Sequence, residues 1–187
     1  MSQEILSKLN TTHIEEISSS RNEPEWLKDY RKNSLSVYDN LPIETSPLYN
    51  KYTDAKKMDP DKVSLSTTTA ETIPSFLQKR LGELENEICI IQIGTNIYKI
   101  NLPDELKSKG LVISSISDAI QNNSELVKKA LEASSSEEDR FTALNNAAFN
   151  SGIFIHIPRN FILEKPIYFC ILTQISSFGR KCNSTLI

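Results

Sequence analysis

Cysteine and histidine are the residues of this chain best suited to chemistry, because thiolates and imidazoles ligate metals and act as nucleophiles or bases. The sequence contains three cysteines, Cys89, Cys170 and Cys182, and two histidines, His13 and His156. The cysteines are widely spaced and form no C-x-x-C pair, so they specify neither a disulfide framework nor a metal site. The two histidines lie far apart in the sequence as well.

The surroundings of these residues favour structural roles. Cys89 and Cys170 each lie in an apolar run, where a thiol behaves as a small buried hydrophobic side chain. Cys182 follows two basic residues that favour a lower thiol pKa, but no nearby base would activate it. His156 alternates with the isoleucines of a predicted strand. It is expected to point away from the face that they bury, without a second ligand near it in sequence.

Two acidic stretches also have structural explanations. SSSEEDR (residues 134–140) places its carboxylates in the first turn of a predicted helix, where they favour the positive end of the helix dipole. The DPD turn at Asp59–Asp61 lacks the other oxygen ligands of a calcium loop. Because G-x-G-x-x-G, P-loop, G-x-S-x-G and H-E-x-x-H motifs are absent, we expect no enzymatic activity. No catalytic, cofactor-binding or metal-binding residue is assigned.

The composition and charge of the chain argue against nucleic acid as a partner. The 187 residues are 39% apolar and carry 24 acidic and 21 basic side chains, a net charge of −3 without blocks of like charge. Such a surface does not track phosphates, so nucleic acid is not expected as a partner. MSQEILSKLN lacks the basic start and apolar core of a secretory signal, and the apolar run Ile167–Leu172 is too short to cross a membrane. We expect a cytoplasmic protein.

The elements that position these residues follow from hydrophobic periodicity. The first 20 residues predict one or two short helical turns, with a capping box of Thr12 and Glu15. A longer helix is predicted over Glu23–Asn40, with Asn22 as its cap and Glu25 completing the box. Its predicted apolar stripe consists of Trp26 as a packing anchor, Tyr30, Val37 and Leu41.

The middle of the chain predicts a small α+β unit. Periodicity disappears in residues 43–72, which are expected to form an irregular connection. PSFLQKRLGEL then predicts a helix, Ile88–Ile100 a hairpin, LPDELKSKG a turn or short helix, LVISSI a strand and SELVKKALE a helix. A last helix is predicted over Glu137–Asn150, capped by Ser136 and Asp139.

The period changes from helical to strand-like after this last helix. Isoleucines alternate with other residues in a strand predicted over Gly152–Ile157, and a second strand follows closely. The expected organisation is amino-terminal helices in residues 1–42, the connection in 43–72, an α+β domain in 73–150 and the start of a strand-rich core in 151–187.

Three stretches resemble, in order and spacing, the SufB/SufD family of iron–sulfur cluster assembly proteins. They are RNEPEWLKDYRKNSLSVYDNLP (21–42), LPDELKSKGLVISSISDAIQNNSELVKKAL (102–131) and DRFTALNNAAFNSGIFIHIPRNFILEKPI (139–167). The third is the most specific, through ALNNAAF, FIHIP and EKPI. The Glu-Pro-Glu-Trp element is closer to SufB and to undivided archaeal-type proteins than to bacterial SufD, but it does not decide between them.

The resemblance implies a scaffold component that acts with the SufC ATPase, of the ABC class, and with a SufB/SufD-type partner. It also implies an α+β fold class, in which amino-terminal helices and a small α+β domain lead into the first strands of a right-handed parallel β-helix. That β-helix is expected to be truncated in residues 151–187. An iron–sulfur cluster is implied for the full-length family complex. The family's cluster-building cysteine and histidine belong to later coils of the β-helix, and no residue of this sequence matches them.

Two other functions are compatible with the sequence. One is a non-enzymatic protein-interaction module that binds a partner through its α+β unit. The other is a carbohydrate-active β-helix protein, which would need clustered carboxylates or basic residues on successive coils. The chain shows no such cluster. The resemblance makes the scaffold component the leading hypothesis.

Overall fold

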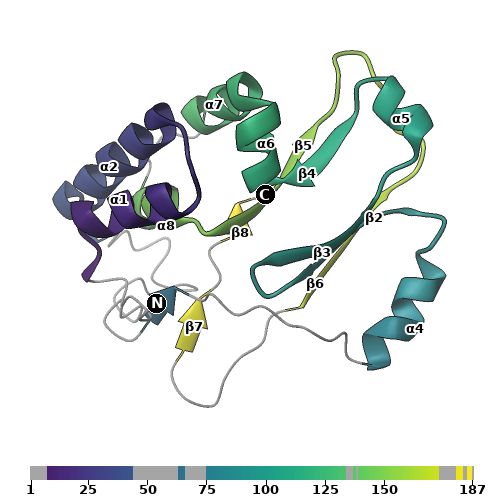
Figure 1. Cartoon of the computed structure of the whole chain (residues 1–187), viewed down its shortest axis with the longest axis horizontal. Coiled ribbons are helices and arrows are strands. Elements are labelled where there is room, and N and C mark those ends of the chain that lie inside the picture. The colour runs from purple at the N-terminus through teal and green to yellow at the C-terminus, as the bar shows by residue number, and fades with distance from the viewer. Residues whose placement is uncertain are drawn as a thin grey trace.

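The computed structural model describes residues 8–43, 63–65, 75–133, 137, 139–172, 180–182 and 185–186. The helices are α1 (Thr11–Ser20), α2 (Glu25–Asn40), α4 (Ser75–Glu83), α5 (Asp104–Ser108), α6 (Ile116–Asn122), α7 (Ser124–Ala133) and α8 (Arg140–Ala148). The strands are β1 (Val63–Leu65), β2 (Ile88–Ile93), β3 (Asn96–Asn101), β4 (Val112–Ser115), β5 (Ser151–His156), β6 (Ile167–Leu172), β7 (Arg180–Cys182) and β8 (Thr185–Leu186). The architecture is α+β, with α1, α2, α6, α7 and α8 gathered beside small mixed sheets (Figure 1).

Helix α1 is capped by residues other than those predicted. The Asn10 side chain accepts hydrogen bonds from the backbone N–H groups of Thr12 and His13, and His13 Nδ1 accepts one from the Asn10 N–H at 3.3 Å. The capping box therefore joins Asn10 and His13, and the predicted box of Thr12 and Glu15 is wrong. Asparagine caps a helix at least as well as threonine, so the start moves to the earlier residue.

Helix α2 begins at Glu25 without a side-chain cap. Pro24 occupies the N-cap position with φ of −67°, which its ring favours. Asn22 has φ of 51° and forms a left-handed turn, so its predicted capping role is wrong. Glu25 pairs instead with Lys28 one turn later, with 2.6 Å between Oε2 and Nζ. The end of α2 agrees with the prediction, which placed it at Asn40.

The buried face of α2 is displaced from the predicted stripe by one position. Leu27, Arg31, Leu35 and Tyr38 are among its buried residues, whereas Trp26, Tyr30 and Val37 are half-buried beside them. Arg31 explains the error, because a charged residue is not counted as core when apolar periodicity is read. Trp26 does anchor the helix, since its Nε1 donates a hydrogen bond to Ser124 Oγ at 2.9 Å and its ring packs against the buried cluster of α6 and α7.

The predicted hairpin is confirmed as β2 and β3, which pair antiparallel with an irregularity at Ile91/Gln92. On its other side β2 pairs in parallel with β6, from Ile88 opposite Ile167 to Ile93 opposite Leu172. Every residue of β2 is buried, because both faces of the strand are covered. Ile88 and Ile90 belong to one apolar cluster, while Cys89, Ile91 and Ile93 belong to another.

The second sheet has the order β4–β5–β8. The predicted strand Gly152–Ile157 is confirmed as β5, which starts and ends one residue earlier and pairs antiparallel with β4. The preceding helix was predicted over Glu137–Asn150 and is shorter. Asp139 caps it as predicted, accepting hydrogen bonds from the backbone N–H groups of Phe141 and Thr142, whereas Ser136 lies outside the described residues.

Helix α6 and strand β1 were not predicted. Helix α6 follows β4 without a break. Ser115, the last residue of β4, is also the N-cap of α6 and accepts a hydrogen bond from the Asp118 N–H at 3.0 Å. Strand β1 lies in the segment expected to be irregular and pairs in parallel with β7. Strands from either side of residue 151 share sheets, because β6 pairs with β2 and β5 with β4. These elements neither show nor exclude the parallel β-helix, which stays a prediction.

Candidate functional site

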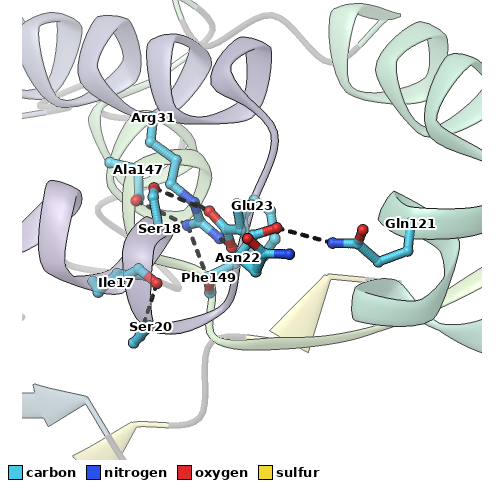
Figure 2. Close-up of polar contacts among 9 residues, drawn as sticks. All are labelled: Ile17, Ser18, Ser20, Asn22, Glu23, Arg31, Gln121, Ala147 and Phe149. Carbon is cyan, nitrogen blue, oxygen red and sulfur yellow. Dashed lines mark hydrogen bonds and ion pairs between the residues drawn. The ribbon is translucent and has the colours of Figure 1, made fainter.

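A buried ion pair connects the amino-terminal helices to the last helix (Figure 2). The Arg31 guanidinium donates to both carboxylate oxygens of Glu23, from Nε at 2.9 Å and from Nη2 at 2.8 Å. Its Nη1 donates to the backbone oxygens of Ala147 at 3.1 Å and Phe149 at 3.0 Å. Glu23 also accepts a hydrogen bond from Ser18 Oγ at 3.1 Å. The side chains of Arg31 and Glu23 are only 0% and 4% exposed.

The charges of Arg31 and Glu23 are compensated within the buried site. Four of the five N–H donors of Arg31 are accounted for by these bonds, and the guanidinium also stacks on the Phe149 ring at 4.0 Å from its centroid. A second cation lies close by, at Arg21. Burial lowers the pKa of the Arg21 guanidinium, and the positive charge of Arg31 lowers it further, against the opposing effect of Glu23.

This arrangement is a structural joint rather than a reactive centre. Arg31 extends from α2 and holds the carbonyls at the end of α8, just before the chain enters β5. The turn before α2 is attached to α6 as well, since Gln121 Nε2 donates to the backbone oxygen of Asn22 at 3.0 Å (Figure 2). The joint therefore sets where α8 stops and where β5 starts.

An open cleft of about 430 Å³ lies between the two sheets. One wall is the run Thr95–Ile100, which includes most of β3, and the other is Ser115–Asp118, where β4 becomes α6. Asn150–Gly152, at the start of β5, complete it. The volume is within the usual range for ligand sites. Because the joint at Arg31 fixes the start of β5, it also fixes this part of the cleft.

Tyr98 is a large and exposed aromatic side chain at the cleft. In the register of the hairpin, Lys99 is opposite Ile91 and Ile97 is opposite Gln92, so Tyr98 is the extra residue of a β-bulge. Its side chain is 52% exposed, although it is a large aromatic one. On the opposite wall, Ser115 Oγ donates to a carboxylate oxygen of Asp118 at 2.6 Å.

The cysteines singled out in the sequence lie away from this cleft. Cys89 is buried in the cluster behind β2, with 1% of its surface exposed, as predicted. Cys170 packs against the same apolar cluster, as expected of a small hydrophobic side chain, but it is half-buried rather than buried. It lies on β6 at an edge of its sheet, where solvent reaches it. The backbone of Cys182 is in β7, and its side chain lies outside the described residues.

The histidines are brought neither together nor to the cleft. His13 is in the first turn of α1, where it closes the capping box. His156 ends β5 opposite Val112 and is half-buried. As predicted, it alternates with the isoleucines of β5, because Ile153 and Ile155 contribute to one cluster while Phe154 contributes to another. Within the described part of the chain, no three metal-ligating side chains form a group, and no helix is long and apolar enough to span a membrane.

Sequence reasoning missed both Arg31 and Tyr98. An arginine between apolar positions of an amphipathic helix, with a glutamate eight residues before it, was an available signal for a buried pair. The bulge at Tyr98 had no comparable signal, because it is visible only in the pairing of β2 with β3.

Comparison with known proteins identifies relatives of most of this chain. A family model described as "SufBD protein N-terminal region" matches residues 4–169. An "Iron-sulfur cluster assembly SufBD family protein" of Staphylococcus aureus (strain USA300) is 30% identical over 179 residues, which cover 86% of this chain and 37% of that protein. The protein of the same description from Staphylococcus saprophyticus is 27% identical over the same coverage. The chain thus spans 37% of the length of these curated relatives.

Proposed function

This chain belongs to the SufBD family of iron–sulfur cluster assembly proteins, and we propose that it acts in cluster assembly as a scaffold component without enzymatic activity of its own. The observation that carries the proposal is the family match over residues 4–169, which includes the joint at Arg31 and the walls of the cleft. The proposed partners are a SufC-type ATPase and a second protein of the SufB/SufD type, in the cytoplasm. The strands after residue 151 are proposed to begin a parallel β-helix.

The iron–sulfur cluster is proposed as cargo of the assembled complex rather than a ligand held by this chain. Cys89 is buried, Cys170 is half-buried, and the described residues contain no third ligand grouped with them. Thiolate ligands for a cluster normally come as a set of four. A stoichiometric cluster found by iron and sulfide analysis after anaerobic reconstitution of the purified chain would contradict this.

Two alternatives differ in how well the cleft suits them. A carbohydrate-active site of the usual kind needs two carboxylates, whereas the residues that line the cleft include one, Asp118, which already accepts a hydrogen bond from Ser115. A protein-interaction module is better supported, because the cleft lies beside β3 and β4, which each have an unpaired edge among the described residues. Such a module is compatible with a scaffold.

The proposed function predicts a specific defect when the gene is silenced. The activity of iron–sulfur enzymes should fall, while an enzyme without a cluster, measured in the same extracts, keeps its activity. Re-expression of this chain should restore the lost activity, and a destabilised Arg31→Ala variant at lower abundance should restore less. Unchanged iron–sulfur enzyme activities under iron limitation would contradict the proposal.

A further inference from the structure

The cleft lies between strand β3 and the junction of β4 with α6, and both strands have an unpaired edge among the described residues. The sheet orders are β3–β2–β6 and β4–β5–β8, so β3 and β4 are both terminal. Helix α5 connects them in sequence, and Figure 1 shows the two strands diverging from the region of that helix. The edge of a sheet presents backbone N–H and C=O groups that can pair with another strand. The cleft therefore offers a backbone-pairing surface on β3.

The lining of the cleft follows the backbone of β3 continuously. Thr95, Asn96 and Ile97 line it together with Tyr98, Lys99 and Ile100. A pocket lined by several consecutive residues of a strand is bounded by the strand's edge rather than by one of its faces, since side chains alternate between faces. The shape suits an extended chain lying alongside β3.

The side chains around the cleft are those that proteins use to recognise other proteins. Ser115, Ser117 and Ser151 line it with Asn96 and Asn150, and Tyr98 is beside them. Tyrosine supplies a large contact area with few rotatable bonds, and serine and asparagine supply adaptable hydrogen bonds, as in antibody combining sites. Because the bulge places Tyr98 out of register with β2, its ring is available as an anchor.

The charges of the cleft indicate one property of its ligand. Asp118 accepts a hydrogen bond from Ser115 Oγ and has its own N–H bound by the same oxygen. Lys99 is exposed on the other wall, and no carboxylate within the described ranges is paired with it. An incoming segment with one acidic residue near Lys99 would supply the missing counter-charge.

We infer that this cleft binds an extended, largely uncharged polypeptide segment of a partner protein, which pairs its backbone with β3, packs against Tyr98 and places a carboxylate near Lys99. The inference rests on the geometry of the cleft and not on the proposed role in cluster assembly. A chain that assembles no clusters would still bind such a segment, and an assembly component could lack this activity.

The test uses a displayed library of random dodecapeptides, selected on the whole purified chain. Selected peptides, made synthetically, should be rich in β-branched residues and contain an acidic residue. They should bind Tyr98→Ala about tenfold more weakly, a typical loss for an aromatic anchor at an interface. Ser117→Arg, which places a long side chain in the opposite wall, should abolish binding altogether. Lys99→Glu should shift the preference toward peptides that carry a basic residue in place of the acidic one.

Matched controls separate the cleft from the rest of the surface. Phe169→Ala removes an aromatic that is 43% exposed on β6, and Lys129→Glu reverses an exposed charge on α7, so both variants should bind as the unchanged chain does. Circular dichroism establishes that each variant is folded. Failure to select any peptide would overturn the inference. So would peptides that bind Tyr98→Ala and Ser117→Arg as tightly as they bind the unchanged chain. So would a dimer of the chain that Ser117→Arg dissociates, because a second copy would then occupy the cleft.

Discussion

At the scale of single residues, Arg31 shows how a charge becomes part of a core. It is fully buried, and its partners come from the turn before α2 and from the end of α8. Removing one member of a buried ion pair leaves the other without compensation, which costs more than the pair itself contributes. The carbonyls of Ala147 and Phe149 would lose a donor at the same time.

We therefore expect Arg31→Ala to lower the free energy of unfolding by about 3–5 kcal/mol. Urea unfolding followed by circular dichroism measures this. Arg140→Ala is the matched control, because Arg140 also stacks on an aromatic ring, that of Tyr38, but is only half-buried. Arg140→Ala should lower the free energy of unfolding by much less than Arg31→Ala does. Equal losses for the two variants would show that ring stacking, rather than the buried pair, provides the stability.

At the scale of elements, the cap of α8 predicts a dependence on pH. Burial raises the pKa of the Asp139 carboxyl, but hydrogen bonds from Thr142 and Phe141 outweigh it and hold that pKa below its ordinary value of 3.8. A carboxylate with a lowered pKa in the folded state stabilises the fold above the unfolded value. That stabilisation is lost as the pH falls through the lowered pKa.

At neutral pH, Asp139→Ala should destabilise the chain by about 0.5–2 kcal/mol, the usual effect of removing a helix cap. Asp139→Asn keeps a cap without the charge, so it should stay near the unchanged chain at pH 7. Below pH 3.8 the unchanged chain should lose stability relative to the asparagine variant. Unfolding curves from pH 7 to about 3 provide the comparison. If the two chains keep a constant difference, the charge of Asp139 has no role.

Elements were more predictable from the sequence than the contacts between them. The hairpin, β5 and the Asp139 cap follow from local signals, namely alternation, glycine and capping residues. Helix α6 was missed because Ile116 extends an apolar run that reads as a strand, and only the Ser115 cap marks the change. The burial of Arg31 also depends on the carbonyls of Ala147 and Phe149, which are 116 and 118 residues away in sequence. The bulge at Tyr98 is visible only in the pairing of β2 with β3.

At the scale of the whole molecule, the strands after residue 151 complete sheets begun much earlier in the chain. Without β5 and β6, the strand β4 would lose its partner, and the buried strand β2 would keep only β3. Cys89, Ile91 and Ile93 would then lose the side chains of β6 that pack beside them. Strands from both sides of residue 150 are therefore hydrogen-bonded in the same sheets.

A chain that ends at Asn150 should accordingly fail to unfold cooperatively. We expect its thermal transition to be broad or absent and a dye specific for apolar surface to bind, because β2 becomes exposed. A chain that ends at Leu172 retains both β5 and β6 and serves as the control, which should unfold in a sharp transition. A sharp transition of the shorter chain would show that residues 75–150 fold without these strands.

The pairing of β2 with β6 also has a consequence during translation. Ile88 is opposite Ile167, so 167 − 88 = 79 residues must be added to the nascent chain after the first residue of the pair before its partner exists. At about 5–20 residues per second, ribosomes take roughly 4–16 s to synthesise that length. For this interval the fully buried strand β2 leaves the exit tunnel with only the hairpin partner β3 available. Its folding in the cell is therefore expected to depend on factors that shield nascent polypeptides.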